Sequence, residues 1–383
     1  MRFQEYEAKE IFKEFGIPVP EGIVINSDSE IIPAIEKIGI PAILKAQVLV
    51  GGRGKAGGIR VVENLEEAVE ACREIFNKKI KGYHVKELLI EKKLEILTEL
   101  YCGITINRTL GRPVIMVSSE GGINIEETAE KNPNKIFTLY CDPLVDIYPF
   151  QIVNLVKNLG LKGDVLLKVS QIIGKLLQIF NKYNGIIVEV NPLVITNNKQ
   201  VLCLDAVIQI DDSALFRYPE FQEKKFNQMD YSLQRLEKKG ATYVQLEGNI
   251  GLICSGAGLA MATMDTIKSF PGLSPANFLE TGGSITPELM EDCMEIVLER
   301  NVLKGIFINI YGGINPIHEG AKGIARVIKD RELEIPIVAK ALGNKQEETW
   351  EILEKAGVYT YKKSDTHGAI NYLAEILHLE VKG

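Results

Sequence analysis

From about residue 240 onward the chain repeats one unit: a short apolar run, a glycine-rich or polar turn, and a segment with helical periodicity. Strands buried on both faces read as continuous apolar runs, and parallel strands need helical crossovers between them. The repeat therefore predicts a small doubly wound parallel sheet. Thr286 as N-cap, followed by Pro287 and Glu288, predicts the start of one of its helices. The predicted strands are 250–254, 276–279, 305–310, 335–340 and 358–361.

The first 235 residues mix helical and extended patterns at irregular intervals, which indicates an α+β arrangement and not a second copy of the repeat. Apolar spacing predicts helices over 3–15 and 65–76, the second with Asn64 as N-cap and Glu67 at position N3. The polar stretch 221–240 is expected to be a helix or linker between two domains, 1–235 and 240–383. The predicted strands here are 42–48, 59–62, 88–91, 99–106, 114–118, 186–190 and 201–208.

Composition limits the class of protein. The chain has 44 Lys+Arg against 51 Asp+Glu and a formal net charge of −7, which disfavours sequence-independent binding of nucleic acid. No apolar run approaches the roughly 20 residues of a membrane span, and the start of the chain is polar and not signal-like. We expect a protein of the cytoplasm, or of an organelle matrix after import. The six scattered cysteines are expected to be reduced and buried, and the four histidines lack the spacing of a zinc site.

The most specific local string is Gly-Gly-Arg-Gly-Lys-Ala-Gly-Gly at 51–58, between two predicted strands. Its glycines allow a close approach to a phosphate, and Arg53 and Lys55 add positive charge. It is not a Walker A loop, because Ala56 stands where that motif needs Ser or Thr. A flexible surface hairpin is the alternative.

Lys45 lies inside the apolar run 41–48. A lysine on an inner strand is costly unless an anion meets it, so a nucleotide phosphate is a natural partner. The alternative is a lysine on an edge strand whose amine reaches water.

A third group of polar residues lies in the segment 189–205. If this is a hairpin with a three-residue loop centred on Asn198, facing positions sum to 396 and Asn191 lies opposite Asp205. Glu189 then lies on the same face, because side chains alternate along a strand. Three oxygen-bearing groups on one face suit Mg²⁺ held jointly with a nucleotide. The alternative is a solvated polar face, and Pro192 weakens the register argument.

The glycine turns of the second half place backbone N–H groups at helix N-termini, which favours anions. Gly256-Ala257-Gly258 resembles a truncated dinucleotide-binding fingerprint, although tight turns alone would also explain these glycines. His318 follows Gly312-Gly313, and a histidine on a helix surface is its expected state.

In this order the strings resemble the β subunit of the succinate–CoA ligase (succinyl-CoA synthetase) family, which comprises acid–thiol ligases that form a nucleoside diphosphate. The resemblance covers essentially the whole chain. It implies an N-terminal ATP-grasp domain followed by a C-terminal flavodoxin-like CoA-ligase domain. The matching segments are 5–9, 51–58, 189–194, 203–205, 214–217, 248–251, 256–261, 277–279 and 309–314.

The family resemblance implies that acid, CoA and ATP give acyl-CoA, ADP and phosphate, with succinate as the first candidate acid. The α subunit of the family carries CoA and a transiently phosphorylated histidine, which Glu189 would orient or stabilise. Asn191 and Asp205 would hold Mg²⁺, and ATP/ADP could be replaced by GTP/GDP. The implied nucleotide contacts are Lys45, Arg53, Gly54, Glu91 and Glu99. The implied acyl-substrate site is Ser255, Gly312, Gly313 and Ile314.

The chain departs from the family pattern at several positions in both halves, and the departures on the substrate side leave the identity of the acid open. Because the Mg²⁺ pair is retained, nucleotide chemistry is expected, whereas malate, citrate or another acid stays open, as does αβ or α2β2 assembly. An ATP-grasp carboxylate–amine ligase and a non-catalytic paralogue are the competing interpretations. The departures are Leu49 for histidine, Val207 for lysine, Ser255 for asparagine, Asn315-Pro316 for a hydrophobic residue and arginine, and 280–284 for Asp-Val-Gly-Gly-Gly.

Overall fold

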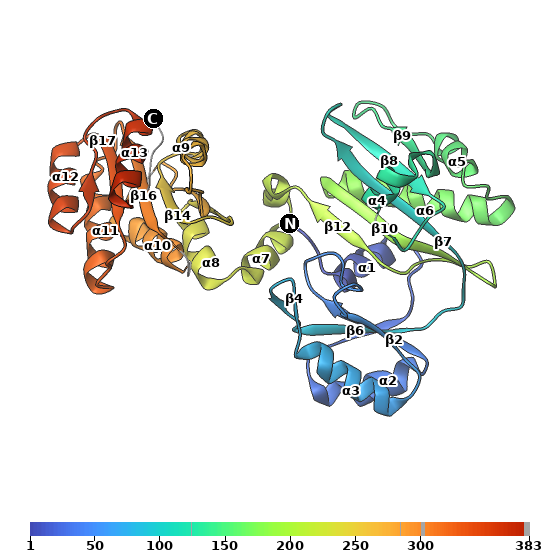
Figure 1. Ribbon diagram of the computed structural model, residues 1–383. Helices are drawn as coiled ribbons and strands as arrows, with labels where there is room; N and C mark the ends of the chain where they lie inside the picture. The colour runs from blue at the N-terminus through green and yellow to red at the C-terminus, as the bar shows by residue number, and fades with distance from the viewer. Residues whose placement is uncertain (124, 284, 300–302, 379–383) are drawn as a thin grey trace. The chain divides into compact units, whose positions relative to one another are not determined.

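The computed structural model describes residues 1–383 except 124, 284, 300–302 and 379–383. These residues form two compact units, Met1–Gln222 and Glu223–Gly383 (Figure 1). Helix α7 (Pro219–Gln228) carries the chain from one unit to the other. Helix α8 (Tyr231–Lys238) belongs to the second unit, because its Leu236 is part of that unit's core. The helical linker expected over 221–240 is therefore two helices.

A four-stranded antiparallel sheet of order β1-β6-β2-β3 forms one part of the first unit. Helices α2 (Ile31–Ile38) and α3 (Leu65–Phe76) cover one face, and Asn64 accepts a hydrogen bond from the Glu67 amide at 2.9 Å, which confirms the predicted cap. Because side chains alternate, Leu44 packs against these helices while Lys45 points to the opposite face. The strands are β1 (Gly22–Ile25), β2 (Ala42–Gln47), β3 (Ile59–Val62) and β6 (Glu87–Lys92).

A second antiparallel sheet of order β11-β10-β7-β8-β9, with β12 also paired to β10, completes the first unit. Helices α5 (Pro149–Lys157) and α6 (Gly163–Lys182) pack against it, and α1 (Glu5–Glu14) adds Ala8, Ile11 and Phe12 to the same core (Figure 1). The strands are β7 (Ile96–Asn107), β8 (Arg112–Ser118), β9 (Ile136–Tyr140), β10 (Gly185–Thr196), β11 (Val201–Cys203) and β12 (Val207–Ile210). The smaller elements are β4 (Lys79–Ile80), β5 (Tyr83–His84) and α4 (Ile125–Lys131).

The predicted strand over 201–208 is in fact two strands, because residues 204–206 leave the ladder between β11 and β12. Both strands nevertheless keep one register against β10. Leu193 pairs with Cys203 and Glu189 pairs with Val207, and both pairs sum to 396. The predicted hairpin register is confirmed, and Asp205 lies in the short irregular segment.

The second unit is a six-stranded sheet of order β13-β15-β14-β16-β17-β18. The pairings from β15 to β18 are parallel, which confirms the doubly wound prediction, whereas the short edge strand β13 is antiparallel and was not predicted. Thr286 accepts the capping hydrogen bond from the Leu289 amide at 3.2 Å. The strands are β13 (Thr242–Gln245), β14 (Ile250–Cys254), β15 (Asn277–Glu280), β16 (Gly305–Gly312), β17 (Ile337–Gly343) and β18 (Tyr359–Thr360).

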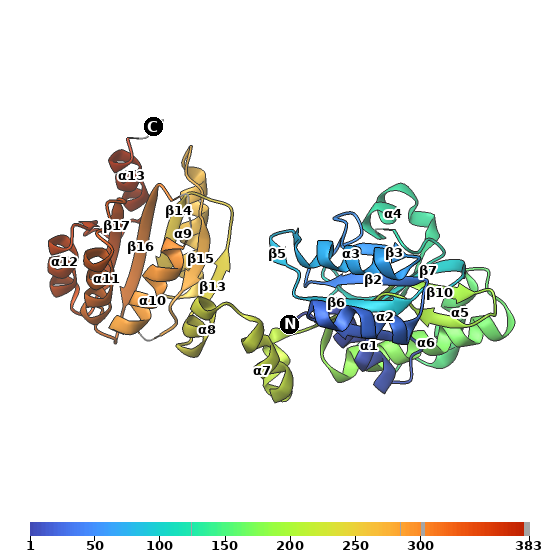
Figure 2. The same cartoon turned by 90° about the horizontal axis from the view of Figure 1, so that it is seen from below.

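Helices cover both faces of this sheet (Figure 2). Helices α9 (Ala257–Ser269) and α13 (Thr366–Ile376) pack on one face. The other face carries α8, α10 (Pro287–Leu298), α11 (His318–Asp330) and α12 (Gln346–Lys355). All six cysteines of the chain are buried free thiols, as expected. None of the described helices combines the length and apolarity that a membrane span requires.

Candidate functional site

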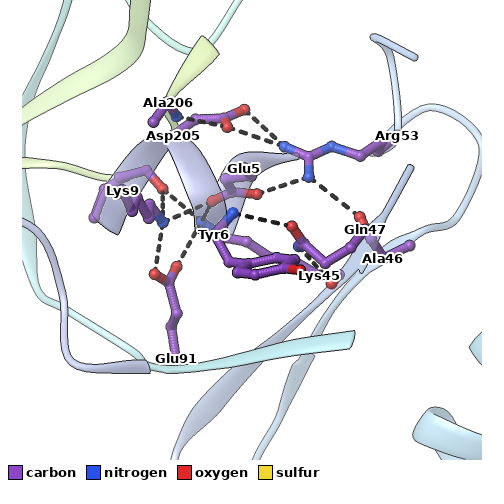
Figure 3. A network of polar contacts seen from close by, with 11 residues as sticks. Glu5, Tyr6, Lys9, Lys45, Ala46, Gln47, Arg53, Glu91, Asp205 and Ala206 are labelled. Carbon is purple, nitrogen blue, oxygen red and sulfur yellow. Dashed lines mark hydrogen bonds and ion pairs between the residues drawn. The ribbon is translucent and has the colours of Figure 1, made fainter. Parts of the chain in front are cut away.

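A buried network of charged side chains lies between α1 and the first sheet (Figure 3). The Lys45 ammonium lies 2.9 Å from Glu5 Oε1 and 2.7 Å from Glu91 Oε2, and it donates to the Leu204 carbonyl at 2.5 Å. Lys45 is 7% exposed and lies on β2, which has strands on both sides. The alternative interpretation, a lysine on an edge strand whose amine reaches water, is therefore wrong. The anions beside Lys45 are carboxylates of the chain itself.

Arg53 joins the glycine-rich loop to the hairpin of the second sheet. Its Nη2 donates to both carboxylate oxygens of Asp205 at 3.0 Å, and its Nη1 lies 2.7 Å from Glu5 Oε2 (Figure 3). Gly54, by contrast, is exposed, and Lys55 is an exposed side chain paired with Glu127 at 3.2 Å. The loop is therefore anchored at Arg53, unlike a free surface hairpin.

Lys9 completes the network from α1. Its ammonium lies 2.6 Å from Glu5 Oε1 and 2.5 Å from Glu91 Oε1, and it donates to the Leu204 carbonyl at 2.7 Å. Glu91, predicted to contact the nucleotide, thus has both oxygens engaged by lysines. The network contains three cations, Lys9, Lys45 and Arg53, and three carboxylates, Glu5, Glu91 and Asp205, so its formal charge sums to zero.

Charge pairing decides the ionisation of the network. Burial alone would raise the pKa of Glu5, but Lys45, Lys9 and Arg53 hold that pKa well below its usual value. Burial alone would lower the pKa of Lys45, but Glu5 and Glu91 raise it well above its usual value. Both side chains therefore carry their charges at neutral pH.

Asn191 holds a neighbouring turn in place. Its Oδ1 accepts from the Gly122 amide at 2.8 Å, and its Nδ2 donates to the Ile123 carbonyl at 2.8 Å. Glu99 lies against the same turn, because a Cβ added to Gly122 would come within 2.3 Å of Glu99 Oε2. The structure therefore brings Glu99 and Asn191 to one turn, while Lys45, Arg53, Glu91 and Asp205 share the charged network.

Glu189 is half-buried on β10. Burial, followed by the neighbouring Asp205 carboxylate, raises the pKa of Glu189 to about 7, against the opposing effects of Arg2 and the Tyr101 hydroxyl. Tyr101 is 2% exposed, and Gly103 makes room for it, since a Cβ there would lie 2.5 Å from the Tyr101 oxygen. Nothing in the sequence pattern pointed to Tyr101. A carboxyl group with a near-neutral pKa can hold or release a proton at physiological pH.

The hairpin residues fit a cation that is shared with phosphate. The register on either side gives Asn191 and Asp205 positions that sum to 396, although Asp205 itself lies in the irregular segment between β11 and β12. The two residues offer one amide oxygen and one carboxylate, which are hard donors of low total charge. Within the described parts of the chain, no three His, Cys, Asp or Glu side chains gather as a metal cluster. A Mg²⁺ ion at this hairpin would thus take further oxygens from phosphate or water.

The predicted acyl-substrate residues lie at the topological switch point of the second unit. Strand order reverses between β14 and β16, where ligands of open α/β sheets bind. Ser255 follows β14, and its Oγ accepts from the Tyr311 amide at 2.8 Å, beside Gly312 at the end of β16. Ile314 is 92% exposed. The structure therefore brings Ser255, Gly312, Gly313 and Ile314 together at the carboxyl ends of β14 and β16, which we call the switch-point edge.

Asn344 follows directly after β17 and supports this edge. Its backbone amide donates to the Gly312 carbonyl and its Nδ2 donates to the Ile314 carbonyl, both at 2.8 Å. Gly343 has φ of 116°, and a Cβ there would lie 2.0 Å from the Gly312 oxygen, so only glycine permits this approach.

The departures in the second unit lie near the same edge, whereas Leu49 and Val207 belong to the first unit. Asn315 donates from its side chain to the Gly283 carbonyl, while Ser284 lies outside the described residues. His318 is the first residue of α11, with its Nε2 2.9 Å from Glu319 and its side chain 17% exposed.

Each of the two units matches a known protein family. Residues 2–195 match the ATP-grasp domain family, and residues 253–371 match the CoA-ligase family, which confirms the predicted fold class. The chain is similar to succinate–CoA ligase beta subunits from several organisms, of which three are compared with it. The ADP-forming subunit of Ignicoccus hospitalis is 40% identical over 365 residues, 95% of this chain and 96% of that protein.

Of the other two relatives, one is named for forming ADP and the other for forming GDP. The ADP-forming subunit of Methanocaldococcus jannaschii is 42% identical over 360 residues, 94% of this chain and 95% of that protein. The GDP-forming subunit of Thermus thermophilus is 39% identical over 365 residues, 95% of this chain and 96% of that protein.

Among solved structures, the fold is similar to ATP citrate lyase from Methanothrix soehngenii in complex with citrate and coenzyme A. The TM-score is 0.71 at 18% identity, over 98% of this chain and 99% of that chain. At this identity the likeness concerns the fold alone.

Proposed function

The chain belongs to the family of succinate–CoA ligase beta subunits, and on this premise we propose that it uses a nucleotide to join succinate to coenzyme A. The reaction is succinate, CoA and ATP giving succinyl-CoA, ADP and phosphate. It proceeds through a phosphohistidine on an alpha subunit, which also binds most of the CoA. The observation that carries the proposal is the charged network that joins Lys45 and Arg53 to Asp205.

Lys45 and Arg53 bind the nucleotide phosphates in this proposal. Both stay cationic, because carboxylates raise the pKa of each above its usual value. Gly54 lets the backbone of the loop approach the phosphates, and Glu91 and Glu99 complete the nucleotide contacts. Positioning and charge stabilisation are what phosphoryl transfer chiefly needs.

Asn191 and Asp205 hold Mg²⁺ in this proposal. Bound there, Mg²⁺ would supply positive charge to offset the negative charge that develops on the transferred phosphoryl group. Asp205 gives both oxygens to Arg53 in the structure, so an ion held by Asp205 would have to share those oxygens with Arg53.

Glu189 orients the partner's histidine in this proposal. Its near-neutral pKa allows the carboxyl group either to accept a hydrogen bond from an imidazole N–H or to hold a proton. Burial and the neighbouring Asp205 raise this pKa, whereas Arg2 and Tyr101 oppose the increase.

A partner subunit follows from membership of a beta-subunit family, and the alpha subunit is the proposed partner. The chain alone should therefore form no acyl-CoA, because none of its four histidines lies in the context expected of the phosphohistidine. The test is a thioester assay with the purified chain, before and after addition of the alpha subunit. Turnover by the chain alone would contradict the proposal.

A cytoplasmic location is part of the same proposal.

The same chemistry on another carboxylic acid is the second candidate. It is favoured by Ser255 and Asn315-Pro316 at the switch-point edge, where the family usually has longer or charged side chains. The reconstituted complex should be tested on succinate, malate, itaconate, glutarate and citrate. A preference for succinate above about a hundredfold in kcat/KM would exclude this second candidate.

A further inference from the structure

Glu5 and Lys9 are buried members of the charged network to which the proposed nucleotide and metal contacts give no role. They come from the string Glu-Tyr-Glu-Ala-Lys at the start of α1 and are 4% and 3% exposed. Their spacing of four residues places them on one face of the helix. Burying an ion costs several kcal/mol before pairing, so two such residues in one helical turn call for a specific explanation.

Helix α1 contacts both sheets of the first unit. Its Ala8, Ile11 and Phe12 pack in the core of the second sheet, while Glu5 and Lys9 contact side chains of β2 and β6 in the first (Figure 3). Packing on one side of the helix therefore fixes where the Glu5 carboxylate lies on the other.

The Glu5 carboxylate gives one oxygen to each of two cations. Oε1 lies 2.9 Å from the Lys45 ammonium, and Oε2 lies 2.7 Å from Arg53 Nη1. Lys45 is on β2 and Arg53 is on the glycine-rich loop, and two cations this close would repel each other in a buried site without an anion between them. Lys9 in turn holds Glu5 Oε1 at 2.6 Å and balances the added negative charge.

We propose that Glu5 is a positioning residue of the nucleotide site. Its two oxygens hold the Lys45 ammonium and the Arg53 guanidinium side by side, in the arrangement that a nucleoside di- or triphosphate requires. Lys9 fixes Glu5 for this task. The inference rests on the proposed function, because it takes Lys45 and Arg53 as the phosphate contacts.

Two other roles for Glu5 make different predictions. A carboxylate that only balances charge for folding would change stability but leave the nucleotide affinity of the folded protein unaltered. A carboxylate that competes with phosphate for the two cations would weaken binding, and its removal would tighten the affinity for nucleotide. Nucleotide affinity therefore separates the three roles.

The test is ADP and ATP binding to the full chain by titration calorimetry, with KM and kcat measured in the complex with the alpha subunit. Glu5→Gln should raise Kd and nucleotide KM by at least about tenfold, the effect of one charge-assisted contact. The kcat should fall as well, because in the proposed function Lys45 and Arg53 also stabilise the charge of the transferred phosphoryl group. The matched control is Glu10→Gln, the same change at an exposed position of α1, which should leave Kd unaltered.

A folded Glu5→Gln protein with wild-type or tighter affinity would overturn the positioning role. Lys45→Met separates this failure from that of the proposed function: if Lys45→Met also binds ADP normally, the nucleotide site itself is misassigned. Should Glu5→Gln fail to fold, Glu5→Gln with Lys9→Met removes one charge of each sign and keeps the network neutral. Weakened ADP binding by that double variant supports the role, and wild-type binding overturns it.

Discussion

Replacing Lys45 by methionine should destabilise the first unit strongly, because it leaves buried carboxylates without a partner. The Lys45 ammonium contacts Glu5 at 2.9 Å, Glu91 at 2.7 Å and the Leu204 carbonyl at 2.5 Å. Without it, two cations face three carboxylates in the network. Breaking a buried ion pair by removing one partner costs about 3–5 kcal/mol, and in a unit of this size that lowers Tm by about 6–20 °C.

The assay is urea unfolding followed by far-UV circular dichroism, with Trp350 fluorescence recorded in the same samples. Trp350 is the single tryptophan of the chain and lies on α12 in the second unit, so its transition provides an internal control. Lys55→Met is the matched variant, since Lys55 is 84% exposed and its ion pair is with the exposed Glu127; it should cost less than about 1 kcal/mol.

A charge-balanced double variant tests the cause. Lys45→Met with Glu91→Gln leaves two cations and two carboxylates, so it should recover at least half of the lost stability. A Lys45→Met cost as small as that of Lys55→Met would refute the argument. Strict additivity of the two single substitutions would refute it as well, because the two charges would then be uncoupled.

Three further predictions concern the candidate site. Asp205→Ala should abolish Mg²⁺-dependent phosphorylation of the partner's histidine without preventing assembly; labelled ATP and size-exclusion chromatography measure the two, and an unchanged phosphorylation rate would mean that the metal role is wrong. Glu189→Gln should stabilise the protein by about 2–3 kcal/mol at pH 8 and not at all below pH 4.5. The sign follows because the pKa of Glu189 is raised from 4.5 to about 7, so the wild-type fold loses stability as pH rises through that window; chemical denaturation at both pH values checks it, and a pH-independent difference would contradict it. Pro316→Arg should raise kcat/KM for succinate relative to citrate by about one to two orders of magnitude through one new charge-assisted contact, and a ratio that does not change in the acid series would count against this placement.

Features that depend on short stretches of chain could be predicted from the sequence. The parallel strands of the second unit appear as apolar runs, and the Asn64 and Thr286 caps follow from residue type and spacing. The register of β10 against β11 and β12 follows from the length of one loop. Each of these is decided by neighbours within a few residues, where periodicity and turn geometry act.

Strand β13 and the break between β11 and β12 were harder to predict. Strand β13 is short and mostly exposed, so it lacks the apolar signal of a buried strand. The break between β11 and β12 was missed because residues 204–206 continue a mixed polar and apolar pattern without a glycine or proline.

Only the tertiary structure shows which charged side chains form ion pairs with each other. The sequence correctly predicted that Lys45 needs an anion, but Glu5 and Glu91 come from a helix and a strand that lie 40 and 46 positions away along the chain. The bidentate pairing of Arg53 with Asp205 spans 152 positions. The sequence around a charged residue can show only that burying the charge is costly. Its partner depends on how α1 packs between the two sheets, which cannot be inferred from a local pattern.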